Sequence, residues 1–326
     1  MKNSIYFIII ILIISILTIS CNSDDDGSAN TIYKQYMRSF VQNISAWAKT
    51  QQADFIIIPQ NGHELATVDG NEEDPPDSAY IDAIDGAGQE DLFYGYDYDD
   101  ITTPAVERDY LLSFLDLYES NSVEVLVTDY CSTSGKMDDS YAQSFSRGFI
   151  SFAADQRGLD NIPEYPITPY NINDLDIGTL SDAQNFLYLL DPSPFLTKIA
   201  FIAAIVATNY DVIIIDLYFN EIALTLTEIN SLKTKAIDGS RLVICYMSIG
   251  EAEDYRYYWE GGWEPGSPDW IVEENPDWEG NYKVQYWDPE WQAIIYGDVD
   301  SYLQKIINSG FDGVYLDIID AFEYFE

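Results

Sequence analysis

The 326-residue sequence predicts a single α/β domain built as a (β/α)8 barrel. Short apolar runs alternate with segments of helical periodicity, which is the pattern of βα units. The runs are apolar throughout, as in parallel strands buried on both faces. Most of them are followed at once by a carboxylate or an amide. The length also suits one domain, because barrels of about 250 residues or more are common.

The first half of the chain begins with a helix that carries apolar residues at helical spacing over 33–47. A second helix covers 110–118. The predicted strands span 55–59, 81–87, 123–128 and 148–153. Segment 158–182 is rich in Pro, Asn and Asp and has no period, so we expect a connector between two halves.

The second half supplies four more strands. These span 186–190, 212–215, 242–247 and 314–316. Helices are expected near 195–206 and 302–307, and the capping box from Thr225 to Glu228 begins another. A tryptophan-rich insertion covers 250–291.

The N-terminus has the features of a lipoprotein signal peptide over residues 1–20. Lys2 precedes an apolar run over 5–19 that is too short to span a bilayer. Ser20-Cys21 resembles a bacterial lipobox, so Cys21 is the predicted lipidation site. Acidic residues follow in a predicted linker over 21–30, with the barrel over 31–326. We expect an exported outer-membrane lipoprotein exposed at the cell surface and held to the membrane only by its lipid.

Charge and composition exclude several classes of function. With 56 acidic and 15 basic residues, the net charge of −41 excludes a nucleic-acid footprint and favours a neutral or cationic ligand. His63 is the only histidine, which argues against a histidine zinc site or a Ser/His/Asp triad. No phosphate loop or calcium-ligand spacing is present, so we expect no metal and no cofactor. Cys131 and Cys245 do not make a disulfide framework.

The chemistry of a barrel lies at the carboxyl ends of its strands. Any one acidic residue there could be a solvated loop charge in so negative a chain, but their shared position is informative. Cleavage of a glycosidic bond needs two such carboxyl groups. The residues that follow the strands are Gln60, Asn61, Glu90, Asp91, Asp129, Tyr130, Asp191, Asp216, Ser248, Glu251, Asp317 and Asp320.

Aromatic residues crowd the same loops, where exposed rings could stack on sugar faces. We expect Tyr94 and Trp259 to face a ligand. Trp287 and Trp291 are expected to pack the insertion onto the barrel instead.

Several motifs resemble the TIM-barrel domain of glycoside hydrolase family 114. The motifs are Cys245–Arg256, Tyr286–Trp291, Gly310–Asp320, Pro59–Gly62, Asp85–Glu90 and Val127–Tyr130. Their order is inverted relative to the family, so the barrel looks circularly permuted, with the connector joining the family's usual ends. A barrel allows this, because it can be opened at any surface loop while its strand pairs are kept.

The resemblance implies an endo-α-1,4-polygalactosaminidase-like activity on an α-linked galactosamine polymer. It implies Asp317 and Glu90 as the catalytic pair, two strands apart in space. Residues that bind or support the substrate would be Asp216, Glu251, Asn61, Gln60, Asp129 and Tyr130. Because the sequence ends soon after Asp317, we expect a loose tail or one completed by a partner.

Two other hypotheses stay open from the sequence. One is a non-catalytic surface lipoprotein that binds glycans with a degenerate hydrolase barrel. The other is a structural surface lipoprotein that neither binds nor cleaves glycans.

Overall fold

The computed structural model describes residues 26–326, with side chains from residue 32 onward. The predicted signal peptide over 1–20 and the lipidation site Cys21 lie outside the described residues. Helix α1 (Asp26–Gln51) includes residues 26–30, so it takes in the second half of the predicted linker. Among the described helices, none is both long and apolar enough to cross a bilayer.

Eight parallel strands form the centre of the molecule in two sheets. The larger sheet has the order β1 (Ile56–Pro59), β13 (Gly313–Asp317), β9 (Leu242–Ser248), β6 (Val212–Ile215), β5 (Phe186–Leu189). The smaller sheet has the order β2 (Gly86–Glu90), β3 (Glu124–Tyr130), β4 (Ile150–Ala154). The first strand therefore pairs in parallel with the last one.

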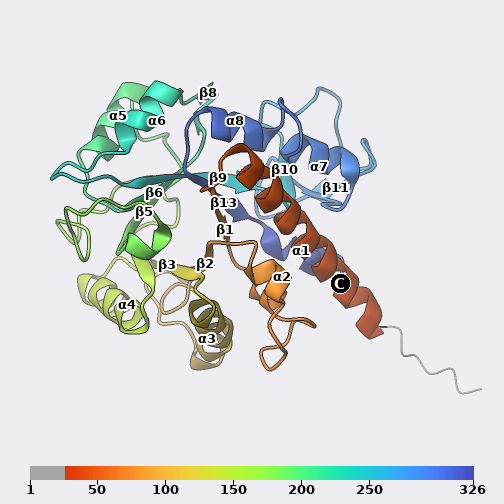
Figure 1. Ribbon diagram of the computed structural model, residues 1–326, viewed down its shortest axis with the longest axis horizontal. Helices are drawn as coiled ribbons and strands as arrows, with labels where there is room; N and C mark the ends of the chain where they lie inside the picture. Colours follow the sequence, from red (N-terminus) through yellow and green to blue (C-terminus); the bar gives the residue numbers. More distant parts are fainter. Residues whose placement is uncertain (1–25) are drawn as a thin grey trace, which may run out of the picture.

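The two sheets meet at both edges through single parallel bridges. Gln60 pairs with Gly88 between β1 and β2, and Ser151 pairs with Asn185 between β4 and β5. Neighbouring strands thus follow the chain order around a TIM-barrel-like core, with helices on the outside (Figure 1). The helices are α2 (Ser78–Ile81), α3 (Ala105–Ser120), α4 (Ser134–Arg147), α5 (Lys198–Val206), α6 (Leu226–Leu232), α7 (Pro289–Ile295) and α8 (Tyr302–Asn308), besides α1.

Seven of the predicted strands agree with the observed ones to within two residues, and the capping box at Thr225 is present. The prediction for the second strand was wrong. Segment 78–81 is the helix α2, and the strand runs over 86–90. Helix α4 was not predicted, because its serines and aspartates have low helix propensity and only Met137 and Tyr141 supply large apolar side chains to its buried face.

Strand β2 contains glycines where a buried strand normally has branched side chains. A Cβ atom at Gly88 would lie 2.0 Å from the hydroxyl oxygen of Tyr315 on β13 and 2.5 Å from its ring. The ring of Tyr315 therefore fills the space that a side chain at position 88 would need. This close approach explains why an apolar run does not mark the strand.

The insertion after β9 contains an antiparallel sheet of β10 (Glu251–Glu253), β12 (Asn281–Val284) and β11 (Ile271–Glu274). Trp291 is fully buried and donates from Nε1 to the carbonyl of Ile249 at 2.9 Å. The ring of Trp287 lies 5.2 Å from that of Tyr33 on α1. Both tryptophans pack the insertion against its neighbours, as predicted.

The residues after Asp317 are packed rather than loose. They form the 3-10 helix η3 (Ile319–Tyr324), and Phe325 packs against Tyr33 and Trp287 with ring centroids 5.5 and 4.7 Å away. The Glu326 carboxylate pairs with Lys34 of α1 at 2.5 Å. Figure 1 shows the C-terminus beside α1.

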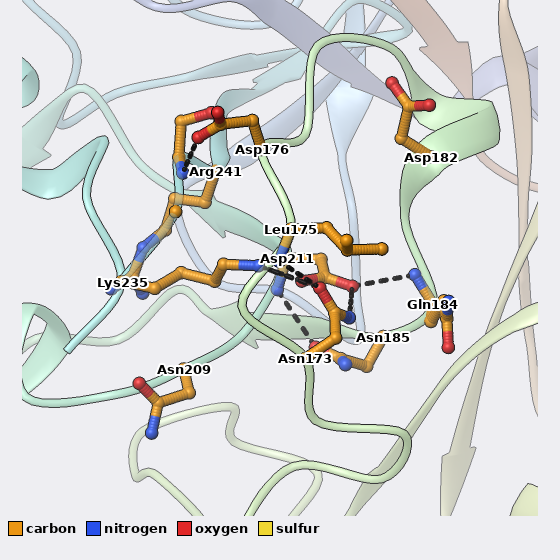
Figure 2. A network of polar contacts seen from close by, with 12 residues as sticks. Asn173, Leu175, Asp176, Asp182, Gln184, Asn185, Asn209, Asp211, Lys235 and Arg241 are labelled. Atoms are coloured by element: carbon orange, nitrogen blue, oxygen red, sulfur yellow. Dashed lines mark hydrogen bonds and ion pairs between the residues drawn. The ribbon is translucent and has the colours of Figure 1, made fainter. Parts of the chain in front are cut away.

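The connector contains no helix or strand until η2 (Leu180–Asp182) and is held by a buried ion pair. The Lys235 ammonium lies 2.9 Å from the Asp211 carboxylate, and both side chains are fully buried. Asp211 also accepts from the Asn173 amide at 2.8 Å and from the backbone N–H of Gln184 at 2.9 Å (Figure 2). Asn185 accepts from the backbone N–H of Asp211 at 2.9 Å. The network ties the connector to the start of β5 and β6.

We expect Lys235→Met to lower the free energy of unfolding by roughly 3–5 kcal/mol, because it leaves Asp211 as a buried charge without its partner. The exposed pair of Arg147 and Asp116 provides a control, and Arg147→Met should cost less than about 1 kcal/mol. Urea denaturation of both variants measures the difference. Equal, small effects would show that the connector does not depend on this ion pair.

Candidate active site

A cavity of about 1070 Å³ lies at the carboxyl ends of the strands. Each of the eight strands contributes a lining residue at or close to this end. In strand order these are Gln60, Glu90, Tyr130, Arg157, Asp191, Asp216, Tyr246 and Asp317. Nine carboxylates and two guanidinium groups line the cavity in all.

Glu90 and Asp317 stand two strands apart, as predicted, with Gln60 of the intervening strand between them. The Gln60 amide donates to Glu90 Oε2 at 2.7 Å. The Tyr188 hydroxyl donates to Gln60 Oε1 at 3.0 Å, which fixes the orientation of that amide. The Tyr130 hydroxyl donates to Glu90 Oε1. The Glu90 carboxyl is therefore held from both sides.

Asp317 has its own hydroxyl donor. Tyr246 on the neighbouring strand β9 donates to Asp317 Oδ2 at 2.6 Å. Burial raises the pKa of Asp317, and the Tyr246 hydrogen bond opposes this rise by stabilising the ionised form. A buried carboxylate with only a hydroxyl and one backbone N–H as donors keeps oxygen lone pairs free for a ligand.

Burial and the negative charge of Asp317 raise the pKa of Glu90 to about 7, although the Tyr130 hydrogen bond opposes the rise. The pKa of Asp320 is also raised to about 7, by burial and by Asp317. Burial and the charge of Asp317 thus move the pKa of two carboxyl groups of this site towards neutral pH.

Both cationic side chains of the cavity are neutralised by pairs of carboxylates. Arg157 binds Asp91 at 2.8 Å and Asp99 at 2.7 Å, and it stacks on the Tyr130 ring at 3.9 Å. Arg256 binds Asp216 at 2.7 Å and Glu253 at 2.6 Å. The unpaired charge in the lining is therefore negative.

Six predicted site residues line the cavity. They are Gln60, Asn61, Glu90, Tyr130, Asp216 and Asp317. Asp216 differs from the expectation in one respect, because its carboxylate is already occupied by Arg256.

Two predicted substrate-binding carboxylates serve the scaffold instead. Asp129 is fully buried and accepts from the backbone N–H of Phe93 at 2.8 Å and from the Ser140 hydroxyl at 2.6 Å. Glu251 is also buried and accepts from the Asn275 amide at 2.8 Å and the Tyr324 hydroxyl at 3.0 Å. Each carboxylate fixes a loop beside the cavity without lining it.

Neither of the two aromatic residues expected to face a ligand lines the cavity. Tyr94 is buried, and its hydroxyl donates to Asp139 at 2.8 Å. Trp259 packs on Tyr282, with ring centroids 4.7 Å apart. The rings that do line the cavity with large exposed area are Tyr255, Tyr257 and Trp278.

Other lining residues were missed by inspecting only the strand ends. Arg157 and Arg256 lie farther along their loops. Asp191 and Asp320, both expected to follow a strand, do line the cavity. Within residues 26–326, no three His, Cys, Asp or Glu side chains are grouped so as to hold a metal ion. Cys131 and Cys245 are buried and free.

The fold and site define a TIM-barrel-like protein with a carboxylate-lined cavity, a class that includes many glycoside hydrolases. The family model of glycoside hydrolase family GH114 matches residues 183–326, which run from just before β5 to η3 and Glu326. Over these residues the chain is similar to that family.

Three curated proteins share shorter segments with this chain. An uncharacterized protein of Methanocaldococcus jannaschii, MJ1477, is 57% identical over 84 residues, covering 26% of this chain and 23% of that protein. Uncharacterized proteins of Deinococcus radiodurans and Thermotoga maritima are each 48% identical, over 91 and 88 residues. These segments cover 28% and 27% of this chain, and 28% and 26% of the two relatives. The chain thus spans about a quarter of the length of these relatives.

We expect the protein to be more stable near pH 5 than near pH 8. The pKa of Glu90 rises from 4.5 to about 7 on folding, so the folded state binds more protons in this range and loses stability as the pH rises through it. The raised pKa of Asp320 likewise lowers the stability of the folded state as the pH rises. Glu90→Gln should remove about 1 kcal/mol or more of the difference, measured by urea denaturation at both pH values.

Proposed function

We propose that the protein is a glycoside hydrolase in which Glu90 is the general acid and Asp317 is the second carboxylate. The observation that carries this proposal is the placement of the two carboxyl groups at the same mouth, two strands apart, with Gln60 between them. The similarity of residues 183–326 to the GH114 family model supports it from the sequence.

The raised pKa of Glu90 suits the acid, which must hold a proton near neutral pH to protonate the leaving oxygen. Asp317, stabilised as an anion by Tyr246, would attack the anomeric carbon or activate a water. Gln60 and Tyr130 hold the Glu90 carboxyl in place during the proton transfer. Activity should therefore fall as the pH rises through about 7, because Glu90 then loses its proton.

The substrate we propose is an α-linked galactosamine polymer, cleaved internally. Deacetylated amino sugars carry positive charge near neutral pH. The cavity has nine carboxylates, and both of its guanidinium groups are already paired, so its field attracts such a polymer. Exposed rings at the rim, including Tyr255 and Trp278, can stack on sugar faces. A volume of about 1070 Å³ leaves room for several sugar units.

We also propose that the two sheets close into one (β/α)8 barrel that is a circular permutation of the family's chain. The bridges at Gln60 and Ser151 support closure, and so does the parallel pairing of β1 with β13. The family match begins at residue 183, just before β5, where the permuted order would place the family's first strand. Attachment to the outer membrane through Cys21, facing the cell surface, is part of the same proposal.

We expect Glu90→Gln and Asp317→Asn each to lower the rate of reducing-end release by about 10²–10⁴-fold, because each removes a carboxyl group that takes part in the bond cleavage. Incubating the domain with α-linked galactosamine, N-acetylgalactosamine and neutral glycans measures this rate. Glu72→Gln is the control, since the side chain of Glu72 is exposed and does not line the cavity.

Undiminished cleavage by either variant would contradict the assignment. Tight binding of a glycan by the wild-type protein without release of reducing ends would instead support the binding-only hypothesis.

A further inference from the structure

A second, smaller cavity of about 330 Å³ adjoins the main one. Its walls come from the 3-10 helix η1 (His63–Ala66), the loop after β2, helix α3 and η3. The two cavities share three lining residues, Asn61, Glu90 and Asp320. Asp317 lines the large cavity but not the small one. The two proposed catalytic carboxyl groups are therefore placed differently relative to the two cavities.

This difference has a direct meaning for a glycosidase. The general acid protonates the oxygen that joins two sugar units, so it lies at the boundary between them. The second carboxylate acts on the anomeric carbon and so touches only the unit that carries that carbon. Glu90, which lines both cavities, therefore has the position of the acid. Asp317, which lines only the large cavity, marks the side of the anomeric carbon.

We infer that the small cavity binds the sugar on the leaving-group side of the cleaved bond, while the large cavity binds the chain that carries the anomeric carbon. The inference rests on the proposed function. The volumes of the two cavities agree with this assignment. The small cavity, at about 330 Å³, lies at the low end of the range for ligand sites, and the large cavity, at about 1070 Å³, lies at the high end. The small cavity thus takes one or two units, and the large cavity takes more.

The lining of the small cavity also indicates which sugar it accepts. It contains the carboxylates of Glu64 and Glu323 and no lysine or arginine. The Tyr110 hydroxyl donates to Glu64 at 3.0 Å, and the Tyr96 ring is about half exposed at 49%. These groups offer an aromatic surface beside negative charge, which suits a sugar with an ammonium group.

His63 adds a polar group that the protein does not satisfy. Its ring is buried, and Nε2 lies 2.6 Å from Gln89 Oε1, while Nδ1 has no hydrogen-bond partner among the described residues. Burial lowers the pKa of His63 to about 4, so the ring is neutral at neutral pH. With Nε2 donating to the amide oxygen, Nδ1 is left as a buried acceptor without a partner in the wall of the small cavity.

Glycosyl fluorides distinguish the leaving-group side of the cleaved bond from the anomeric-carbon side. Fluoride is the leaving group in these probes, and it does not occupy the leaving-group sugar site. The probes are a reducing-end-labelled α-1,4-galactosamine hexasaccharide and the α-fluoride of the corresponding trisaccharide. We expect Tyr96→Ala to lower kcat/KM for the hexasaccharide roughly fivefold, through loss of a ring contact, and to leave the fluoride rate unchanged. Glu323→Gln should give the same pattern, and the label should appear on a mono- or disaccharide.

Tyr98→Ala is the matched control, since Tyr98 is 77% exposed and lines neither cavity. A fall in the fluoride rate equal to that for the hexasaccharide, or no effect of either small-cavity variant, would overturn the inference while leaving the proposed function intact. A wild-type protein that cleaves neither probe would overturn the proposed function itself.

Discussion

The parallel pairing of the first strand with the last is the contact on which the site depends. Tyr315 and Leu316 of β13 lie opposite Ile58 and Pro59 of β1, and the Gln60 N–H continues the ladder to the Leu316 carbonyl at 2.8 Å. This register brings the ends of both strands to one level. The side chain of Gln60 therefore reaches the carboxyl of the next strand, and residues from opposite ends of the numbering form one centre.

The structure divides carboxylates of similar burial into two kinds by the donors around them. Asp129 is surrounded by backbone N–H groups and a serine, so its lone pairs are used within the scaffold. Asp317 meets one tyrosine hydroxyl, the backbone N–H of Ile318 and the cavity. In a chain with 56 acidic and 15 basic residues, few cations are present to neutralise such groups. At the cavity floor, tyrosine hydroxyls and amides donate hydrogen bonds to the carboxylates instead. These neutral donors leave the negative charge of the cavity in place.

Most strand positions, and the placement of Glu90 and Asp317 at strand ends that line one cavity, could be predicted from the sequence because each depends on local pattern. Strand β2 was misplaced because Gly86 and Gly88 break its apolar pattern, and only the ring of Tyr315 explains the glycine at 88. The role of Tyr94 was misjudged, since an aromatic residue in a loop can either stack on a ligand or pack on protein. The small cavity could not be predicted, because four segments distant in sequence form it.

The contact between Gly88 and Tyr315 joins two strands that carry the proposed acid and the second carboxylate. The same ring lies 5.2 Å from that of Tyr188, whose hydroxyl orients Gln60. Positions 88 and 315 are therefore not independent. A relative with a small residue at 315 could accept a side chain at 88, and one that keeps the tyrosine could not. The two positions should covary in an alignment, which gives a criterion for recognising this site in related sequences.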